Sequence, residues 1–467
     1  MSTFSGLNTA YSALTAARRG MDVVGQNIAN LNTPGYTRQR VETSAVGALP
    51  SGFPSTGVRV GQGVNVDSIA RLGSLQLDAR VRATSAVSGF SAVRANALST
   101  LETSLNEPGT NGISAALDDF WAAWQGMSNK PGDESAARVL LGQASTVAGR
   151  ITAGYRAVEN QYRDVRQDLT AMSDELNTAA AQLANLNGAI RSTLANGGSA
   201  NELMDQRAAL ATTVAALAGG TVRAGEDGMV DVLVEGNAIV TGTVARRLDV
   251  VGGTSLGTSV ADPVRLEWSH RPGTAQELSG GEMAGALSLL ASDGTLKQAA
   301  DSYNTLAEKL ASNVNETHRK GSTTTGETGL DFFNFGSGPM ALGLQVVPTN
   351  ASGIATGAGG TAGALDGSNA AEISQIGAGT DSPDSLWSAF VAGTGSTART
   401  EMQQAQLAGS AASSALGMQL SNSSVDVDEE NMNLLAYQQA YQGAARVMSA
   451  IDEMLDTLIN RTGIVGR

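Results

Sequence analysis

The sequence of 467 residues contains no cysteine, two histidines and few aromatic residues. Without cysteine the chain cannot form disulfides, bind zinc through thiolates or carry out thiol catalysis. Aromatic residues make up 4% of the sequence, so its core must be built mostly from alanine, leucine and valine. Small side chains allow helix axes to approach closely, and we therefore expect stability to come from helix packing.

Positive charge is also scarce, with 30 lysine and arginine residues against 44 acidic residues and a net charge of -14. No run of basic residues offers a surface for nucleic acid or anionic lipid. The first charged residue is Arg18, and polar residues interrupt the segment before it, so a cleaved signal peptide is not expected. The longest uncharged stretch, 332–365, is rich in glycine, serine and threonine, which argues against a membrane span.

Apolar residues at heptad spacing near both ends predict two helices that pair with each other and with neighbouring copies of the chain. Arg18 and Gly25 interrupt the N-terminal stripe, whereas the C-terminal stripe is continuous. Two ordinary amphipathic helices on one core are the alternative, but matched stripes at opposite ends of a long chain favour pairing. The predicted assembly seam consists of Phe4, Leu7, Tyr11, Leu14, Met21, Ile28, Leu434, Tyr437, Tyr441, Met448, Ile451, Leu455 and Leu458.

The interior is predicted to hold a long helical rod, because the three-four spacing continues from Tyr155 to Ile190. Such a rod is at least ~50 Å long at ~1.5 Å per residue. Its predicted partners are helices within 136–151, 287–314 and 402–420, which together give an elongated bundle.

Alternating valines predict two β-hairpins between the helices. One includes Val58, Val60, Val64 and Val66, and the other spans 230–239 across Glu235-Gly236-Asn237. The predicted fold is therefore mainly α with β insertions, an elongated multi-domain α+β protein. Its predicted parts are a terminal coiled-coil domain (1–70 and 425–467), a helical bundle (71–220, 276–320 and 396–424), a β-hairpin region (221–275) and a small β-rich outer insertion (321–395).

Residues that could carry chemistry are few. His270 and His318 lie in different predicted elements, and neither has a second histidine nearby for zinc. One histidine would suffice for a Ser-His-Asp triad, so the number of histidines does not by itself exclude one. His318 is predicted to be a capping or surface residue. Asp426 and Asp428 lack the glycine and glutamate of a calcium loop and fit a helix start better. No catalytic, metal or cofactor site is expected.

Several motifs together resemble a known family. Residues 27–38 read NIANLNTPGYTR, a helix end followed by a turn with Asn27, Asn30, Pro34, Gly35 and Tyr36. This stretch and the C-terminal stretch 425–448 resemble the two ends of bacterial flagellar axial proteins, which include rod, hook and hook-associated proteins. The interior stretches LDDFWAAW (117–124), NELMDQR (201–207) and SGGEM (279–283) are similar to the hook-associated protein 1 family. The resemblance covers nearly the whole chain, and the short segment 321–395 departs from it.

The resemblance implies a structural subunit, not an enzyme, that joins the flagellar hook to the filament. It implies export without a cleaved signal peptide through the flagellar type III channel to the extracellular flagellum. The implied partners are neighbouring copies, the hook protein, the third hook-associated protein and a cytosolic export chaperone at about 425–467, with no nucleic acid and no membrane. Another axial protein (a hook protein or the second junction subunit) and a secreted enzyme with chemistry in 221–395 are the alternatives.

Overall fold

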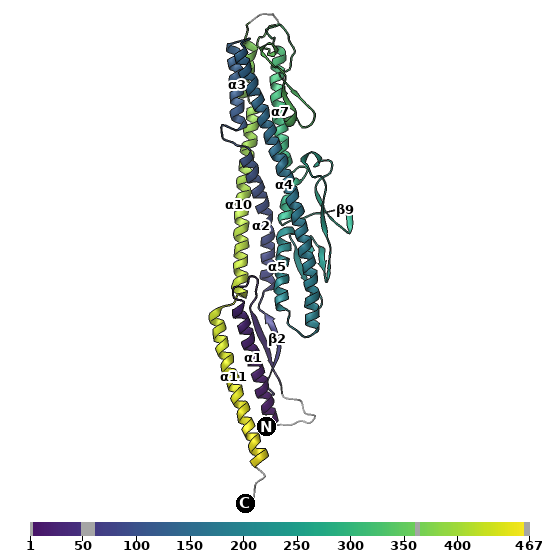
Figure 1. Ribbon diagram of the computed structural model, residues 1–467, viewed down its shortest axis with the longest axis vertical. Coiled ribbons are helices and arrows are strands. Elements are labelled where there is room, and N and C mark those ends of the chain that lie inside the picture. Colours follow the sequence, from purple (N-terminus) through teal and green to yellow (C-terminus); the bar gives the residue numbers. More distant parts are fainter. Residues whose placement is uncertain (1–2, 48–60, 360–364, 462–467) are drawn as a thin grey trace, which may run out of the picture.

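The computed structural model describes residues 3–47, 61–359 and 365–461 as an elongated, mostly helical molecule (Figure 1). The first and the last described residues lie near one tip, in a terminal unit built from two helices and a hairpin. A longer helical body continues from it, and a small β lobe lies on one side of this body. The predicted class, mainly α with β insertions, is confirmed.

The terminal unit joins the two ends of the sequence. Helices α1 (Thr3–Ala29) and α11 (Val427–Asp456) pack along each other, and the short π-helix η4 (Thr457–Arg461) follows α11. Strand β1 (Gln39–Ala45) pairs antiparallel with β2 (Val64–Arg71), and both strands contact α1. The first hairpin was predicted within 58–66, but β2 pairs with the upstream strand β1, and Val58 and Val60 lie outside the described residues.

The body contains two layers of long helices. Helices α2 (Leu75–Ser104) and α10 (Pro383–Ser423) pack together over much of their lengths. Against them lie α3 (Ile113–Asn129), α4 (Glu134–Ala195), α5 (Asn201–Ala218), α6 (Glu282–Leu290) and α7 (Thr295–Lys320). Helix α4 has 62 residues, which corresponds to roughly 90 Å.

The predicted rod is correct, but two of its predicted partners are not. Residues 136–151 form the first part of α4 itself, so they cannot lie beside it. Residues 402–420 pack mainly on α2 rather than on the rod, and their helix begins at Pro383, not at 396. Ser382 caps this helix by accepting a hydrogen bond from Ser385 N at 3.0 Å, and proline suits its first turn. The segment 287–314, in α6 and α7, packs on α4 as predicted.

The β lobe is anchored to α4 by asparagine side chains. Its first sheet has the order β3 (Thr221–Ala224), β4 (Val230–Val234), β5 (Asn237–Thr241), β6 (Val244–Ala245). Its second contains β7 (Leu248–Val251), β8 (Arg265–Trp268) and β9 (Arg271–Gln276), with the 3-10 turn η1 (Leu256–Thr258) between β7 and β8. The predicted hairpin at 235–237 is confirmed, with φ of 48° at Glu235 and 77° at Gly236. Asn187 Nδ2 donates to Val230 O and Gly242 O, each at 2.7 Å.

The described part of 321–395 is not the predicted β-rich domain. Its sheet has two three-residue strands, β10 (Phe333–Phe335) and β11 (Leu344–Val346). The other elements before α10 are α8 (Met340–Gly343), η2 (Ala351–Gly353), α9 (Ser368–Ser374) and η3 (Ile376–Ala378). Few alternating apolar residues are available to pair strands, so the segment instead inserts Phe332 and Phe333 into the core beside Phe120 of α3.

His318, predicted to be a capping or surface residue, is completely buried and fastens this segment to α7. Its Nδ1 lies 2.7 Å from Leu330 O, and its Nε2 lies 2.9 Å from Ala355 N. Because a backbone N–H must donate to Nε2, the ring is neutral, with its proton on Nδ1. Burial lowers the pKa of His318 below its ordinary value of 6.5.

Candidate functional site: the terminal helix pair and its joint

Helix α1 faces α11 with small residues, not with its predicted seam. The buried positions include Ala10, Ala17, Gly20, Val24 and Asn27. Each of these lies one residue before a position of the predicted heptad stripe, a rotation of about 100° around the helix. Val23 is buried as well and does not belong to this row. The prediction that the helices pair is correct, and the prediction of which face of α1 pairs is wrong.

Helix α11 contributes the larger side chains to this contact. In the predicted stripe Ala444 and Ile451 are buried, while Leu434, Tyr437, Met448 and Leu455 are half-buried; Tyr441 and Leu458 are more exposed. The helices come closest at glycines, since a Cβ on Gly20 would lie 2.5 Å from the Tyr437 ring. A Cβ on Gly6 would lie 3.1 Å from Ile451 Cδ1. Large residues of α11 therefore fit over a small-residue face of α1.

The predicted seam of α1 lies beside this contact and is partly open to solvent. Leu7, Leu14, Met21 and Ile28 are half-buried, Tyr11 is 62% exposed, and the side chain of Phe4 lies outside the described residues. Helix α11 also has four exposed apolar residues outside this contact, with exposures between 52% and 67%, which we call its second apolar stripe: Met432, Leu435, Val447 and Met454. The terminal unit thus presents apolar side chains outward from both helices.

The signature turn closes the far end of α1. Asn30 Nδ2 donates to Gln26 O at 3.0 Å, and its Oδ1 accepts from Thr33 Oγ1 at 3.1 Å. Pro34 is exposed, and Gly35 adopts a φ of 79°, in the left-handed region that favours glycine. The chain then reverses and enters β1, so the turn places Tyr36 back against the end of α1.

Asn27 is the centre of this reversal and is almost completely buried. Its Oδ1 accepts from Tyr36 Oη at 2.9 Å and from Gln39 N at 3.0 Å. Its Nδ2 donates to Gln39 O at 2.9 Å and to Glu430 Oε2 at 3.1 Å. Burial, together with the nearby carboxylates of the joint, raises the pKa of Tyr36 to about 12, so its hydroxyl keeps the proton that it donates.

Glu430 connects α11 to this turn. It is 1% exposed and accepts from Arg38 Nε at 2.8 Å as well as from Asn27. Glu429 also pairs with Arg38, while Asp426 caps α11 by accepting from Asp428 N at 2.8 Å. The acidic start of α11 was predicted correctly from the sequence. The sequence did not show that Glu430 is a buried partner of Arg38, whereas Asp426 caps the helix.

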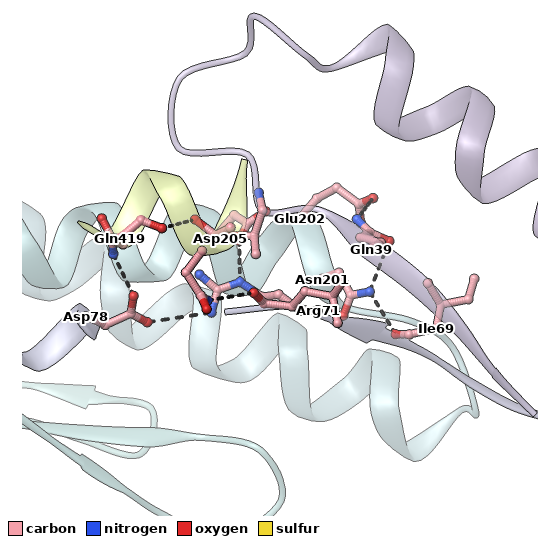
Figure 2. A network of polar contacts seen from close by, with 12 residues as sticks. Gln39, Ile69, Arg71, Asp78, Asn201, Glu202, Asp205 and Gln419 are labelled. Carbon is pink, nitrogen blue, oxygen red and sulfur yellow. Dashed lines mark hydrogen bonds and ion pairs between the residues drawn. The ribbon is translucent and has the colours of Figure 1, made fainter. Parts of the chain in front are cut away.

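The N-terminus of α5 holds the turn from the side of the body, and Figure 2 shows these contacts. Asp205 accepts from Thr37 N at 2.9 Å and pairs with Arg71, which also lies 3.9 Å from Asp78. Asn201 Nδ2 donates to Gln39 Oε1 at 3.0 Å and to Ile69 O at 2.9 Å. Gln39 Nε2 donates to Glu202 Oε1 at 3.2 Å. We call this set of contacts around 37–39 and α5 the polar joint.

The joint is built for positioning. Arg71 lies beside both Asp205 and Asp78, and Arg38 pairs with Glu430, so each of these three buried carboxylates has a cationic partner. Among the described residues, no group of three histidine or acidic side chains could hold a metal ion. No helix in the described ranges is both long and apolar enough to cross a membrane. Of the signature residues, Asn27 and Tyr36 bond to each other and Asn27 also bonds to Glu430 of α11, whereas the bonds of Asn30 stay within the turn.

Comparison with known families agrees with this arrangement at both ends of the chain. Residues 7–37 match the family described as flagella basal body rod protein, and residues 419–461 match the C-terminal part of the flagellar basal body rod FlgEFG proteins. The matched ranges contain most of α1 with its turn and all of α11. The class defined by the paired termini is therefore that of the axial proteins of the bacterial flagellum.

The interior identifies the particular family, since residues 98–333 match the helical domain of the flagellar hook-associated protein FlgK. A flagellar hook-associated protein 1 of Bacillus subtilis is 28% identical and is aligned over the full length of both chains. That of Escherichia coli is 27% identical over 74% of this chain and 64% of its own length. The flagellar hook junction protein FlgK of Burkholderia pseudomallei has a TM-score of 0.48 and 26% identity, covering 56% of this chain and 47% of its own.

The chain belongs to the flagellar hook-associated protein FlgK family. It is a structural subunit of the flagellum at the junction between hook and filament. Of the interior motifs, LDDFWAAW lies in α3 and contributes aromatic side chains to the core. The motif NELMDQR begins α5 and contributes Asn201, Glu202 and Asp205 to the polar joint.

Proposed function

We propose that the chain performs its junction role by burying the outward apolar faces of α1 and α11 against neighbouring copies and adjoining axial proteins. The observation that carries this proposal is the second apolar stripe of α11. A surface helix that needs one partner has one apolar face and a polar opposite face. Helix α11 already packs one apolar face on α1, yet Met432, Leu435, Val447 and Met454 remain more than half exposed. Full burial of each such side chain contributes about 1.5–3 kcal/mol.

The two helices offer different surfaces, which favours an assembly that extends. If the outward face of α1 in one copy contacts the second stripe of α11 in the next, the contact is head-to-tail. Contacts of this kind generate helical arrays when the rotation does not close. The hook protein on one side and the third hook-associated protein on the other are the partners that we propose for the two ends of the array.

The same stripe suggests how the chain is handled before assembly. An apolar face on α11 invites aggregation in the cytosol, so we propose that an export chaperone covers the region 425–467. The chain contains no cysteine, so no disulfide opposes its unfolding for passage through a type III channel to the cell exterior. We further infer that the chain has no enzymatic activity, because the relatives that it matches are structural flagellar proteins.

The test replaces one residue of the stripe with a charge. We expect Leu435→Asp to leave the body folded but to prevent assembly, because a carboxylate cannot be buried at an apolar contact without a partner. Gln438→Asp is the matched control, since Gln438 lies on the same helix and is exposed and polar. In cells lacking the native gene, Leu435→Asp should give hooks without filaments in electron micrographs and flagellin in the medium. Normal filaments and motility with this variant would refute the proposal.

Two further variants test the other parts. Leu455→Asp, at a half-buried position of the predicted seam of α11, should also prevent incorporation into flagella while the body stays folded. Deletion of 425–467 should abolish binding of the chaperone in calorimetry. Retained chaperone affinity after the deletion would place that site elsewhere, without bearing on the assembly stripe.

A further inference from the structure

Three consecutive backbone amides bind three different elements of the fold. Thr37 N donates to Asp205 of α5 at 2.9 Å, and Arg38 N donates to Ser423 O at the end of α10 at 2.9 Å. Gln39 N donates to Asn27 of α1 at 3.0 Å. The segment 37–39 therefore contacts the body and the terminal unit at the same time.

The side chains of the same segment extend these connections. Arg38 reaches the start of α11 through Glu429 and Glu430, and Gln39 reaches the start of α5 through Asn201 and Glu202. Asn27 and Glu430 bond to each other, so one continuous chain of contacts runs from α11 through α1 to α5. Figure 2 shows the α5 side of this chain, where Gln39 lies beside Asn201 and Arg71 beside Asp205.

The polar groups in this series of contacts are buried, so a group that shifts leaves its partner without a hydrogen bond. Asn27, Thr37, Gln39, Asn201, Asp205 and Glu430 are each at most 7% exposed. When a buried polar or charged group loses its hydrogen-bond partner, the fold is destabilised, whereas an exposed group forms a hydrogen bond with water instead. When α11 separates from α1, the bonds of Glu430 to Asn27 and Arg38 break. The segment 37–39, which contacts α5, is then held less firmly. When α5 releases the segment, Asn27 and Arg38 are no longer held where they can bind Glu430.

We propose that the start of α5 is a dock for the segment 37–39, and that docking is energetically coupled to the pairing of α1 with α11. Asn201 and Asp205 are positioning residues that act on both terminal helices through the segment 37–39. Coupling between two such events is reciprocal, so each must strengthen the other by the same factor. The coupling is a property of the single chain, so it does not rest on the partners proposed above.

Hydrogen exchange of the full-length chain tests the first direction. Asp205→Asn removes the charge that pairs with Arg71 and weakens the acceptor of Thr37 N. We expect exchange at least tenfold faster in peptides from α1 and α11, although Asp205 bonds to neither helix. The matched control is Glu401→Gln, which neutralises a mostly buried carboxylate paired with Arg94 at 2.7 Å in the body. This control should leave exchange in α1 and α11 unchanged.

The reverse direction uses a variant that does not touch the dock. Ile451→Ala weakens the helix pair at its contact with Gly6, near the opposite end of α1. We expect faster exchange in peptides that cover 37–39 and the start of α5, with the rest of the body unchanged. This variant leaves the body intact, so it decides the question if Asp205→Asn does not fold.

Faster exchange in the distant element for both variants supports coupling. If Asp205→Asn loosens 37–39 alone, or Ile451→Ala loosens the helix pair alone, the dock is a passive attachment and the proposal is wrong. Assembly into flagella is a separate readout, so failure of the junction proposal cannot be mistaken for failure of this one.

Discussion

Gly20 offers the sharpest test of how the terminal helices pack. Alanine normally stabilises the interior of a helix by about 1 kcal/mol relative to glycine. At Gly20 the added Cβ would lie 2.5 Å from Cε1 of Tyr437, closer than real contacts allow, so the ring or the helix must shift. Overpacking of this kind costs about 1–3 kcal/mol. The two terms together predict that Gly20→Ala lowers the stability of the helix pair by between zero and about 2 kcal/mol.

Gly25 provides the matched control within the same helix. A Cβ at Gly25 would meet no atom of the described residues within 4 Å. We expect Gly25→Ala to stabilise the helix pair by about 1 kcal/mol, the propensity gain alone. The two alanine variants thus differ by about 1–3 kcal/mol, which arises from the contact with α11.

A double-mutant cycle isolates this contact. In a Tyr437→Ala background the steric cost disappears, so Gly20→Ala should become stabilising by about 1 kcal/mol. Hydrogen exchange of α1 and α11 measures each variant as a local unfolding free energy. If Gly20→Ala and Gly25→Ala stabilise the pair equally when Tyr437 is present, the helices do not approach at Gly20 and the displaced contact face is wrong.

Two further predictions concern the body. Because the buried His318 has a lowered pKa, the unfolded chain takes up the proton first; stability should be full above pH 6.5 and fall below it by up to ~1.4 kcal/mol per pH unit. Thermal unfolding from pH 7.5 to 5 should show this fall, and His318→Gln should flatten it; an unchanged slope would contradict the assignment. Trp387→Phe should lower the free energy of unfolding by roughly 1–3 kcal/mol more than Trp124→Phe does, as measured with denaturant. Trp387 Nε1 donates to Glu107 at 2.9 Å, whereas the buried Trp124 Nε1 has no hydrogen-bond partner among the described residues. Equal losses would show that this bond contributes nothing.

The sequence predicted the helix pair but selected the wrong face of α1, for a reason visible in the stripe itself. A stripe chosen by large apolar residues has to tolerate Arg18 and Gly25 at seam positions. Moving it by one residue replaces these two with Ala17 and Val24, and both are buried. In α1 an interruption by a charge was a better indicator of the face than the size of the apolar residues.

Helix α2 shows a second limit of periodicity. Many of its buried positions are alanines or polar residues, including Asp78, Arg82 and Ser91, so the helix has no stripe of large apolar residues to detect. Its partner α10 is also rich in small residues. The buried face of such a helix is defined by the helix that packs against it, and the sequence of the helix alone does not identify that partner.

The polar joint could not be predicted for another reason. Its contacts join residues far apart in sequence, such as Gln39 with Asn201 and Asn27 with Glu430, and no spacing rule relates them. The motifs that resembled the family marked these positions without giving a physical role for them. The structure supplies that role, since the same residues fix the turn, the start of α11 and the start of α5.

The polar joint and the outward apolar faces have different roles: the joint defines geometry, and the apolar faces contribute stability when they are buried. Buried ion pairs add little net stability, because desolvation offsets their attraction, but they accept few arrangements. Apolar faces accept many arrangements and release free energy in proportion to the area buried. In the assembly proposed above, this division is useful: Arg38, Asp205 and Asn27 would set the direction of the terminal helices within one chain, and neighbouring chains would supply the burial that holds them. The terminal unit should therefore be the least stable part of the isolated chain and the most stabilised by assembly.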